Sequence, residues 1–117
     1  MKNKNVRKIY FYRSYYLNFY GNLSPSARNK FDWTLILISS IDRVPTKFLA
    51  HLTGTNGLFE IRVKVDKCIY RVFCFFDQGD LIILLNVFQK KTRKTPRKEI
   101  EKAETLKEQY FNEKNNK

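Results

Sequence analysis

The sequence is poor in the residues that most often bind metals or cross-link a chain. Its 117 residues include one histidine, His51, and two cysteines, Cys68 and Cys74. One histidine and two separated cysteines cannot make a zinc site. The cysteines lie six positions apart in one expected strand, so both point to the same face, about 20 Å from each other, and cannot form a bridge within that strand. We therefore expect two free thiols and no metal or other cofactor.

Long apolar runs and common catalytic motifs are also missing. No apolar run approaches the roughly 20 residues that a membrane-spanning helix needs. The N-terminal stretch is charged, but no small-residue cleavage site follows it. There is no glycine-rich Walker loop and no set of nucleophile, histidine and acid. These absences predict a cytoplasmic protein that makes no use of a membrane.

Acidic residues are scarce, with 11 Asp and Glu against 23 Lys and Arg, which gives a formal net charge of +12. Residues 1–31 hold seven basic residues and no acid, residues 86–98 hold six and no acid, and residues 99–117 hold five acids and four bases. Charge that served solubility alone would be mixed. The segregation favours a binding face for a polyanion, with nucleic acid as the first expectation. A membrane surface and an acidic protein partner are the alternatives.

Aromatic residues are plentiful, with 10 Phe and 7 Tyr, so residues 1–117 can form one domain with a substantial core. We expect Trp33 to belong mostly to that core. Residues 8–13 predict a strand, and residues 14–21 predict a short helical turn. Residues 24–41 predict a helix with Ser24 as its N-cap and Pro25 at its first position. Residues 42–57 read as a loop.

From residue 58 the pattern changes to period two, which is typical of strands. Residues 58–65, 68–76 and 81–88 predict an antiparallel meander with two-residue turns at 66–67 and 78–79. Thr95 could cap a last helix that begins at Pro96. That helix has a narrow apolar stripe made of Ile100, Ala103, Leu106 and Tyr110. The order of elements predicts an α+β fold, in which the N-terminal helices and the C-terminal helix pack on an antiparallel sheet.

The two turns determine which charged side chains share a face. A turn at 66–67 places Arg62 opposite Arg71, and a turn at 78–79 places Arg71 opposite Asn86. One face of the meander would then carry Arg62, Lys64, Arg71, Asn86 and Lys90.

Opposed like charges destabilise a sheet, so we expect a phosphate to lie between the two arginines. Without that anion, Arg71→Gln should leave thermal stability unchanged or slightly raised. The alternative is that Glu60 pairs with one of the arginines and the cluster is only a solvated face.

Two segments resemble a known family. GLFEIRVKVDKCIYRVFCFF at 57–76 and NVFQKKTRKTP at 86–96, followed by a charged helix, resemble the RelE/HigB toxins of bacterial type II toxin–antitoxin systems. The similarity is nearest to the phage-derived Gp49-like branch of HigB and covers residues 45–105 best. It implies a single RelE-like domain and a metal-independent, ribosome-dependent mRNA endonuclease, in which the RNA 2′-hydroxyl attacks the adjacent phosphate. It also implies the ribosome, mRNA and a helix-turn-helix, HigA-like antitoxin as partners.

The resemblance also assigns roles to residues. Arg71 would stabilise the transition state, Arg62 and Lys64 would hold the RNA backbone, and Lys90 or Lys91 would protonate the leaving 5′-oxygen. Further RNA contacts would come from Arg93, Lys94, Arg97 and Asn86. Many relatives have Tyr or His near the end of the site, but TRKTPRKE at 92–99 has neither. Either His51 or a lysine would then act as the general base, or activity would rest mainly on electrostatics.

Two other functions fit parts of this pattern. A ParE-like gyrase poison would have the same fold but would not need the clustered cations. A basic RNA-binding module without catalysis would not need a general base.

Overall fold

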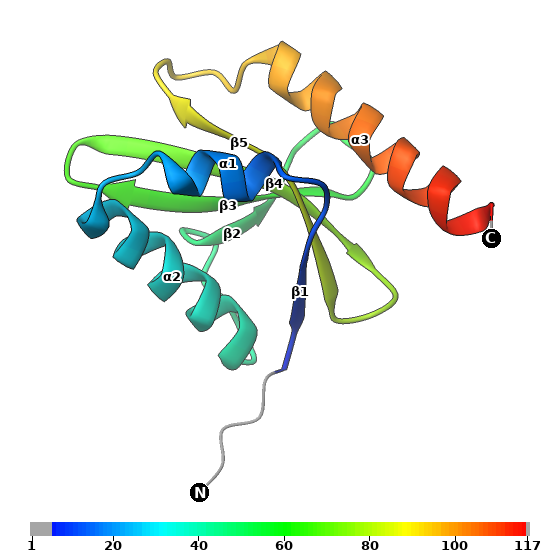
Figure 1. The fold of residues 1–117 in the computed structure, drawn as a ribbon, viewed down its shortest axis with the longest axis horizontal. Coiled ribbons are helices and arrows are strands. Elements are labelled where there is room, and N and C mark those ends of the chain that lie inside the picture. Colours follow the sequence, from blue (N-terminus) through cyan, green and yellow to red (C-terminus); the bar gives the residue numbers. More distant parts are fainter. Residues whose placement is uncertain (1–5, 117) are drawn as a thin grey trace, which may run out of the picture.

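A five-stranded sheet forms the centre of the computed structural model, which describes residues 6–116 (Figure 1). Its strands, in the order β1-β5-β4-β3-β2, are β1 (Lys8–Phe11), β2 (Leu49–His51), β3 (Leu58–Val65), β4 (Cys68–Asp77) and β5 (Leu81–Lys90). The predicted α+β class and the antiparallel meander of β3, β4 and β5 are confirmed. The sheet is mixed because β1 joins β5 in parallel, and the expected loop at 42–57 contains the short strand β2.

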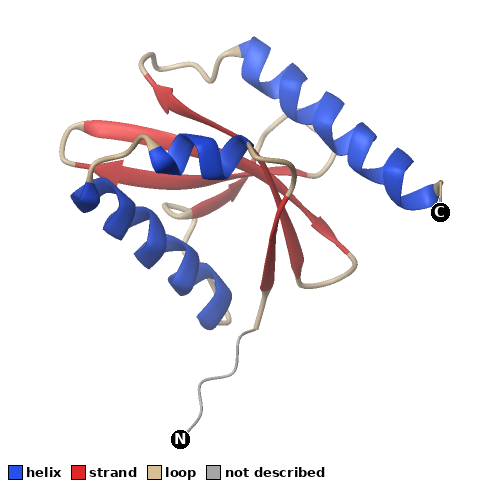
Figure 2. Cartoon of the chain, in the orientation of Figure 1, coloured by secondary structure: helices blue, strands red, loops and turns tan. Residues whose placement is uncertain are grey.

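Helices cover both faces of this sheet (Figure 2). The helices α1 (Tyr15–Gly21) and α2 (Pro25–Ser40) pack on one face, and α3 (Arg97–Asn115) packs on the other. As predicted, the hydroxyl of Ser24 accepts a hydrogen bond from the backbone N–H of Ala27, at 3.2 Å, and caps α2. The predicted start of α3 is wrong by one residue, since Pro96 is its N-cap and no side chain caps it. None of the helices in residues 6–116 is long and apolar enough to cross a membrane.

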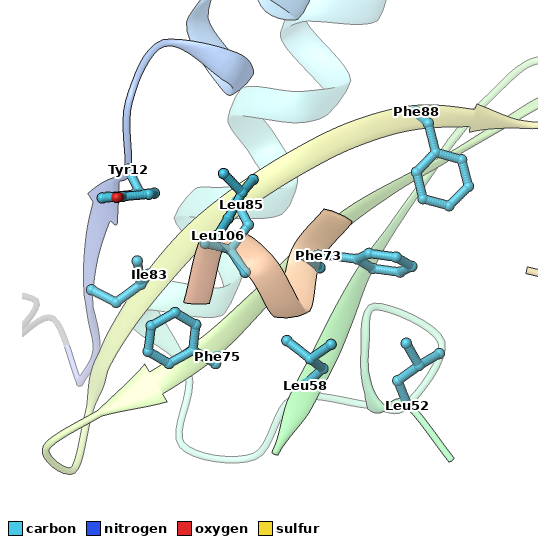
Figure 3. Packing of buried hydrophobic residues seen from close by; sticks show 10 residues of the cluster. Tyr12, Leu52, Leu58, Phe73, Phe75, Ile83, Leu85, Phe88 and Leu106 are labelled. Atoms are coloured by element: carbon cyan, nitrogen blue, oxygen red, sulfur yellow. The ribbon is translucent and has the colours of Figure 1, made fainter. Parts of the chain in front are cut away.

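Each face of the sheet has its own apolar core. Under α2, Phe31 and Ile38 contact a cluster that includes Val72 and Cys74. Under α3, Ala103 and Leu106 pack on a second cluster, made of Leu58, Phe73, Phe75, Ile83, Leu85 and Phe88 among others (Figure 3). The predicted stripe of α3 is therefore confirmed. Both cysteines are free, and burial raises the pKa of the Cys74 thiol.

The strand register was predicted correctly for the hairpin of β3 and β4 but not for the hairpin of β4 and β5. The turn at 66–67 is as expected, with Val65 opposite Cys68 and Arg62 opposite Arg71. The second turn has three residues rather than two, because Asp77 pairs with Leu81. A β-bulge between Val72 and Cys74 sets two residues of β5 against one of β4.

These two changes together shift β5 by two positions, so Arg71 lies opposite Phe88 and not Asn86. Side chains alternate with period two along a strand, so a shift of two residues leaves them on the expected face. Lys90 consequently remains on the Arg71 face, opposite Ile69.

Asp77, at the end of β4, connects α3 to the sheet. Its Oδ2 accepts hydrogen bonds from the Tyr110 hydroxyl, at 2.6 Å, and from Lys114 Nζ, at 2.8 Å. Burial would raise the pKa of Asp77, but the hydrogen bonds from Lys114 and Tyr110 outweigh burial and hold this pKa below its usual value. Burial, and then the hydrogen bond to Asp77, raise the pKa of Tyr110 to about 12.

We expect Asp77 to make the stability of the protein depend on pH in the acidic range. Its folded-state pKa is below its unfolded value of about 3.9, so its contribution is full above that value and is lost as the pH falls through the folded pKa. Asp77→Asn should destabilise the protein by about 1–2 kcal/mol at neutral pH. Thermal unfolding of both proteins between neutral and acidic pH would test this. A difference in melting temperature that stays constant with pH would contradict it.

Candidate functional site

The predicted cations meet at one end of the α3 side of the sheet. Two rows of side chains cross β3, β4 and β5 there, one made of Arg62, Arg71 and Phe88, and the other of Lys64, Ile69 and Lys90. Lys64 is exposed, and Ile69 is 36% exposed although it lies at the centre of three strands. These six residues are called the basic face below.

A buried carboxylate holds the two arginines of the basic face together. Glu60 is 5% exposed, and its Oε2 accepts hydrogen bonds from Arg62 Nε, at 3.1 Å, and Arg62 Nη2, at 2.8 Å. Its Oε1 lies 3.0 Å from Arg71 Nε as an ion pair. The pairing of Glu60 that was noted as the alternative is therefore present, and it involves both arginines rather than one. Glu60 relieves their repulsion without an anion, and a phosphate between them stays a prediction. The expected effect of Arg71→Gln on stability accordingly changes sign.

The two arginines differ in the donors that remain available. All three guanidinium nitrogens of Arg62 are engaged, because its Nη1 donates to the backbone oxygen of Thr46 at 3.3 Å. In Arg71 only Nε lies next to Glu60, as an ion pair without hydrogen-bond geometry, and neither of its two Nη atoms donates a hydrogen bond within residues 6–116. Arg71 therefore has donors left for an anion, whereas Arg62 positions Glu60 and the segment before β2.

The charge of Arg71 survives its burial. The residue is 8% exposed, and burial lowers its pKa, while Glu60 raises it and Arg62 lowers it. An arginine remains protonated at neutral pH despite such effects. A buried, partly unpartnered guanidinium is a strong donor to phosphate oxygens, because both its charge and its two Nη groups can act together.

The connection between β5 and α3 forms a basic rim beside this face (Figure 1). Lys91, Arg93 and Lys94 are exposed and have no ion-pair partner in the described part of the chain. Arg97, at the first position of α3, pairs with Glu101 at 3.5 Å, but both side chains are mostly exposed and such pairs contribute little. On the face itself, Glu60 offsets one of four cations, so a net positive charge remains.

Two predicted site residues lie away from the basic face. Asn86 is 1% exposed, and its Nδ2 donates to the backbone oxygen of Glu99, at 3.1 Å, and to Glu99 Oε1, at 2.9 Å. It anchors the first turn of α3 and is not available to RNA. His51, in β2, pairs with Phe59 of β3, and the centroids of their rings are 5.2 Å apart. Both side chains lie on the α2 side of the sheet, whereas the basic face lies on the α3 side. Neither Asn86 nor His51 is therefore brought together with Arg71.

An open pocket of about 440 Å³ adjoins the basic face at the edge of β3. It lies between α2, the segment before β2 and strands β3 and β4, and is lined by Lys30, Trp33, Thr34, Lys47, Phe48, Arg62, Val63, Lys64, Ile69 and Arg71. Trp33 was expected mostly in the core, but it is 47% exposed. This pocket was not predicted from the sequence, although Lys30 lies three positions before Trp33 on one helix, a spacing that brings the two side chains together.

Comparison with known families identifies the group to which the chain belongs. The family model described as phage derived protein Gp49-like (DUF891) matches residues 18–108, which include β3, β4, β5 and every residue of the basic face. The chain belongs to this family. The Gp49-like family is part of the RelE/HigB-like toxin superfamily and is associated with toxins of toxin–antitoxin systems. A search of curated protein sequences gives no match.

In this Gp49-like protein, the matched segment also includes the basic rim and the pocket beside β3. The family's toxin association and the position of the cations therefore concern the same part of the molecule.

Proposed function

We propose that this Gp49-like protein is the toxin of a type II toxin–antitoxin system and acts as a ribosome-dependent mRNA endonuclease in the cytoplasm. The observation that carries the proposal is the buried Arg71 guanidinium, whose Nη atoms donate no hydrogen bond within residues 6–116 and which lines an open pocket together with four other cations. A polyanion with closely spaced phosphates fits such a surface better than a single small anion does. The Gp49-like family's association with toxins supports the choice of mRNA.

The proposed reaction uses the RNA's own nucleophile. The 2′-hydroxyl gives its proton to solvent water and its oxygen attacks the adjacent phosphorus, the bond from phosphorus to the 5′-oxygen breaks, and the 5′-oxygen takes up a proton, so the products are a 2′,3′-cyclic phosphate and a 5′-hydroxyl. Arg71 would stabilise the charge that develops on the phosphoryl oxygens, an effect of about 3–4 kcal/mol for one well-placed donor. Lys64 and Lys90, on either side of Ile69, would hold neighbouring phosphates in line, and Lys90 or Lys91 would donate the proton to the 5′-oxygen.

The role of Arg62 changes from the one implied by the family resemblance. Because its nitrogens bind Glu60 and Thr46, Arg62 would act as a positioning residue that keeps Glu60 against Arg71. The basic face has no histidine or tyrosine, so the proposed rate enhancement rests on charge stabilisation and alignment rather than on a strong general base.

The decisive experiment adds the purified protein to ribosomes programmed with an mRNA of known sequence. We expect new 5′-hydroxyl ends within the ribosome-bound message and none in the same RNA without ribosomes. Lys8 lies in β1 beside Leu81, at the end of β5 that is opposite the basic face. Lys8→Gln is therefore the matched control, and this variant should cleave normally. DNA breaks after induction in cells, with intact mRNA, would instead indicate a ParE-like gyrase poison.

The absence of histidine and tyrosine from the basic face favours one second candidate, an RNA-binding protein without catalysis. Such a protein would block the ribosome by occupying it. Tight, salt-sensitive binding to programmed ribosomes without new 5′-hydroxyl ends would select this function.

The proposal also includes an antitoxin. The family association implies an antitoxin partner, and a HigA-like, helix-turn-helix protein is the one we propose. An acidic segment of that partner laid against the basic face or its rim would neutralise the charge that the chain itself leaves unpaired.

RNA affinity should fall steeply with salt, because each phosphate contact releases a bound counterion. If Lys64, Lys90, Lys91, Arg93 and Lys94 each contact one phosphate, affinity for single-stranded RNA should fall about a hundredfold between about 50 and 200 mM KCl. Lys91→Gln should reduce the slope of the log–log plot by about 0.7, and Lys8→Gln should leave it unchanged. Dissociation constants from anisotropy of labelled RNA would test this, and a flat plot would exclude a polyanion as the ligand.

A further inference from the structure

An exposed tryptophan forms one wall of the pocket beside β3. Trp33 is the only tryptophan of the chain, and its ring meets the edge of Phe48 with the centroids 5.5 Å apart and the planes at 68°. The Nζ of Lys30 lies 4.9 Å from the Trp33 centroid, and the Nζ of Lys47 lies 5.0 Å from the Phe48 centroid. The buried residues of α2 are Ala27, Phe31, Thr34 and Ile38, so the apolar side of the helix is complete without Trp33.

The charges around this aromatic pair have one sign. The lining includes five cations and no carboxylate, because Glu60 does not reach the pocket surface. A nucleotide presents a flat apolar base next to an anionic phosphate. An aromatic wall with cations beside it is suited to such a ligand, because stacking on the ring and attraction of the phosphate can act at once.

The pocket is continuous with the basic face around the edge of β3. Strand β2 begins at Leu49, opposite Ile61, and the N–H of Arg62 donates to the backbone oxygen of Phe48 at 2.8 Å, which is the last backbone hydrogen bond along that edge within residues 6–116. Beyond it, Lys64 and Arg71 line the pocket and also belong to the basic face. A strand that crosses the basic face can therefore turn over the edge of β3 into the pocket without leaving positively charged surface.

We propose that this pocket binds one nucleotide of single-stranded RNA, with the base stacked on Trp33 and the adjoining phosphate held by Lys64. The inference rests on the proposed function, and it adds a base-binding subsite that adjoins the residues proposed to act on the cleaved phosphate. Lys30 now covers the Trp33 ring. On binding, its long flexible side chain would give up that place to the base and move to the phosphate.

Because Trp33 is the only tryptophan, its fluorescence reports on this pocket alone. The probe is a short single-stranded oligoadenylate, titrated at low salt, with an abasic oligonucleotide of the same length as its control. We expect oligoadenylate to quench Trp33 with the dissociation constant that anisotropy of the labelled RNA gives. The abasic strand should bind more weakly and leave the fluorescence nearly unchanged.

Variants of Trp33 separate stacking of the base from non-specific attraction between RNA and the positive charges. Trp33→Leu should weaken oligoadenylate binding by about 5-fold to 100-fold, the range for loss of one stacked base, and Trp33→Phe should recover most of that loss. Ile36→Ala is the matched control, since Ile36 is also exposed on α2, at 64%, and lies outside the pocket. Melting curves of all three variants should match the wild type, because none of these side chains is part of the buried core.

The outcomes distinguish this inference from the proposed function. RNA binding by anisotropy without quenching, or with Trp33→Leu unchanged in affinity, would overturn the base subsite and leave the endonuclease proposal intact. Equal quenching by the abasic strand would also overturn it, because no base would be required. Absence of RNA binding both free and on the ribosome would overturn the subsite and the proposed function together.

Discussion

Replacing Glu60 with glutamine should lower the melting temperature of the protein by roughly 10 °C or more. The carboxylate is almost fully buried and bridges Arg62 and Arg71, which lie directly opposite each other on β3 and β4. Glutamine keeps the shape but leaves two guanidiniums facing each other without a counter-charge. Breaking a buried ion pair in this way costs about 3 kcal/mol or more. Arg62 is partly exposed, so the lower end of that range applies.

Melting curves of Glu60→Gln and of a matched acid variant would test this. Glu101→Gln is the control, because Glu101 pairs with Arg97 on the surface of α3 and its removal should cost no more than about 0.5 kcal/mol. The double variant Glu60→Gln/Arg71→Gln should be less destabilised than the sum of the two single variants, since it removes the uncompensated charge as well. Equal melting temperatures for Glu60→Gln and Glu101→Gln would show that the bridge contributes nothing.

The sequence was sufficient to predict the element order, but not the details of pairing in β5. The turn at Asp66 and Lys67 was predictable because polar and apolar residues alternate on β3, which fixes its phase. LIILLNVF in β5 is apolar at nearly every position. Its sequence therefore does not show which side chains face which side of the sheet, and the position of a bulge could not be predicted. The three-residue strand β2 is also too short to produce a recognisable period.

These limits explain which site residues were predicted correctly. Arg62, Lys64, Arg71 and Lys90 share a face as expected, because the longer turn and the bulge shift β5 by an even number of residues. Asn86 was misplaced because it lies at the bulge and under the start of α3.

The other two residues were misplaced because their positions depend on tertiary structure, which a local sequence pattern does not predict. His51 was misplaced because its side of the sheet follows from β2, which was not predicted. The exposure of Trp33 depends on how α2 sits against the edge of β3.

The contacts of Glu60 could be predicted only in part from the sequence. The period-two pattern put Glu60 on the same face as both arginines, so a pair was foreseeable. Which of the two it would bind could not be decided, because both lie within reach and the choice depends on burial. In the structure, the central carboxylate binds the buried arginine with one oxygen and the more exposed arginine with the other. This arrangement fixes the Arg71 side chain in place while its Nη atoms stay unengaged, and such pre-organisation is what stabilisation of a developing charge requires.

Arg71→Gln should therefore lower cleavage of ribosome-bound mRNA by about a hundredfold to a thousandfold, the usual effect of removing one donor to a developing oxyanion. It should also destabilise the protein, by about 1–2 kcal/mol, because Glu60 loses one partner but keeps Arg62. The matched variant is Arg62→Gln, which removes the other arm of the same bridge. It should destabilise the protein to a similar extent but lower cleavage by no more than about tenfold, since both Nη atoms of Arg62 are already held by Glu60 and Thr46 and cannot turn together toward a phosphate.

Cleavage rates measured well below both melting temperatures, beside melting curves, would separate the two roles. If both variants lost activity in proportion to their loss of stability, Arg71 would be a structural residue and the proposed catalytic role would be wrong. Arg71→Lys adds a second criterion. A lysine keeps the charge but cannot offer two parallel donors beyond the contact with Glu60. It should therefore recover most of the stability and only a small part of the cleavage rate.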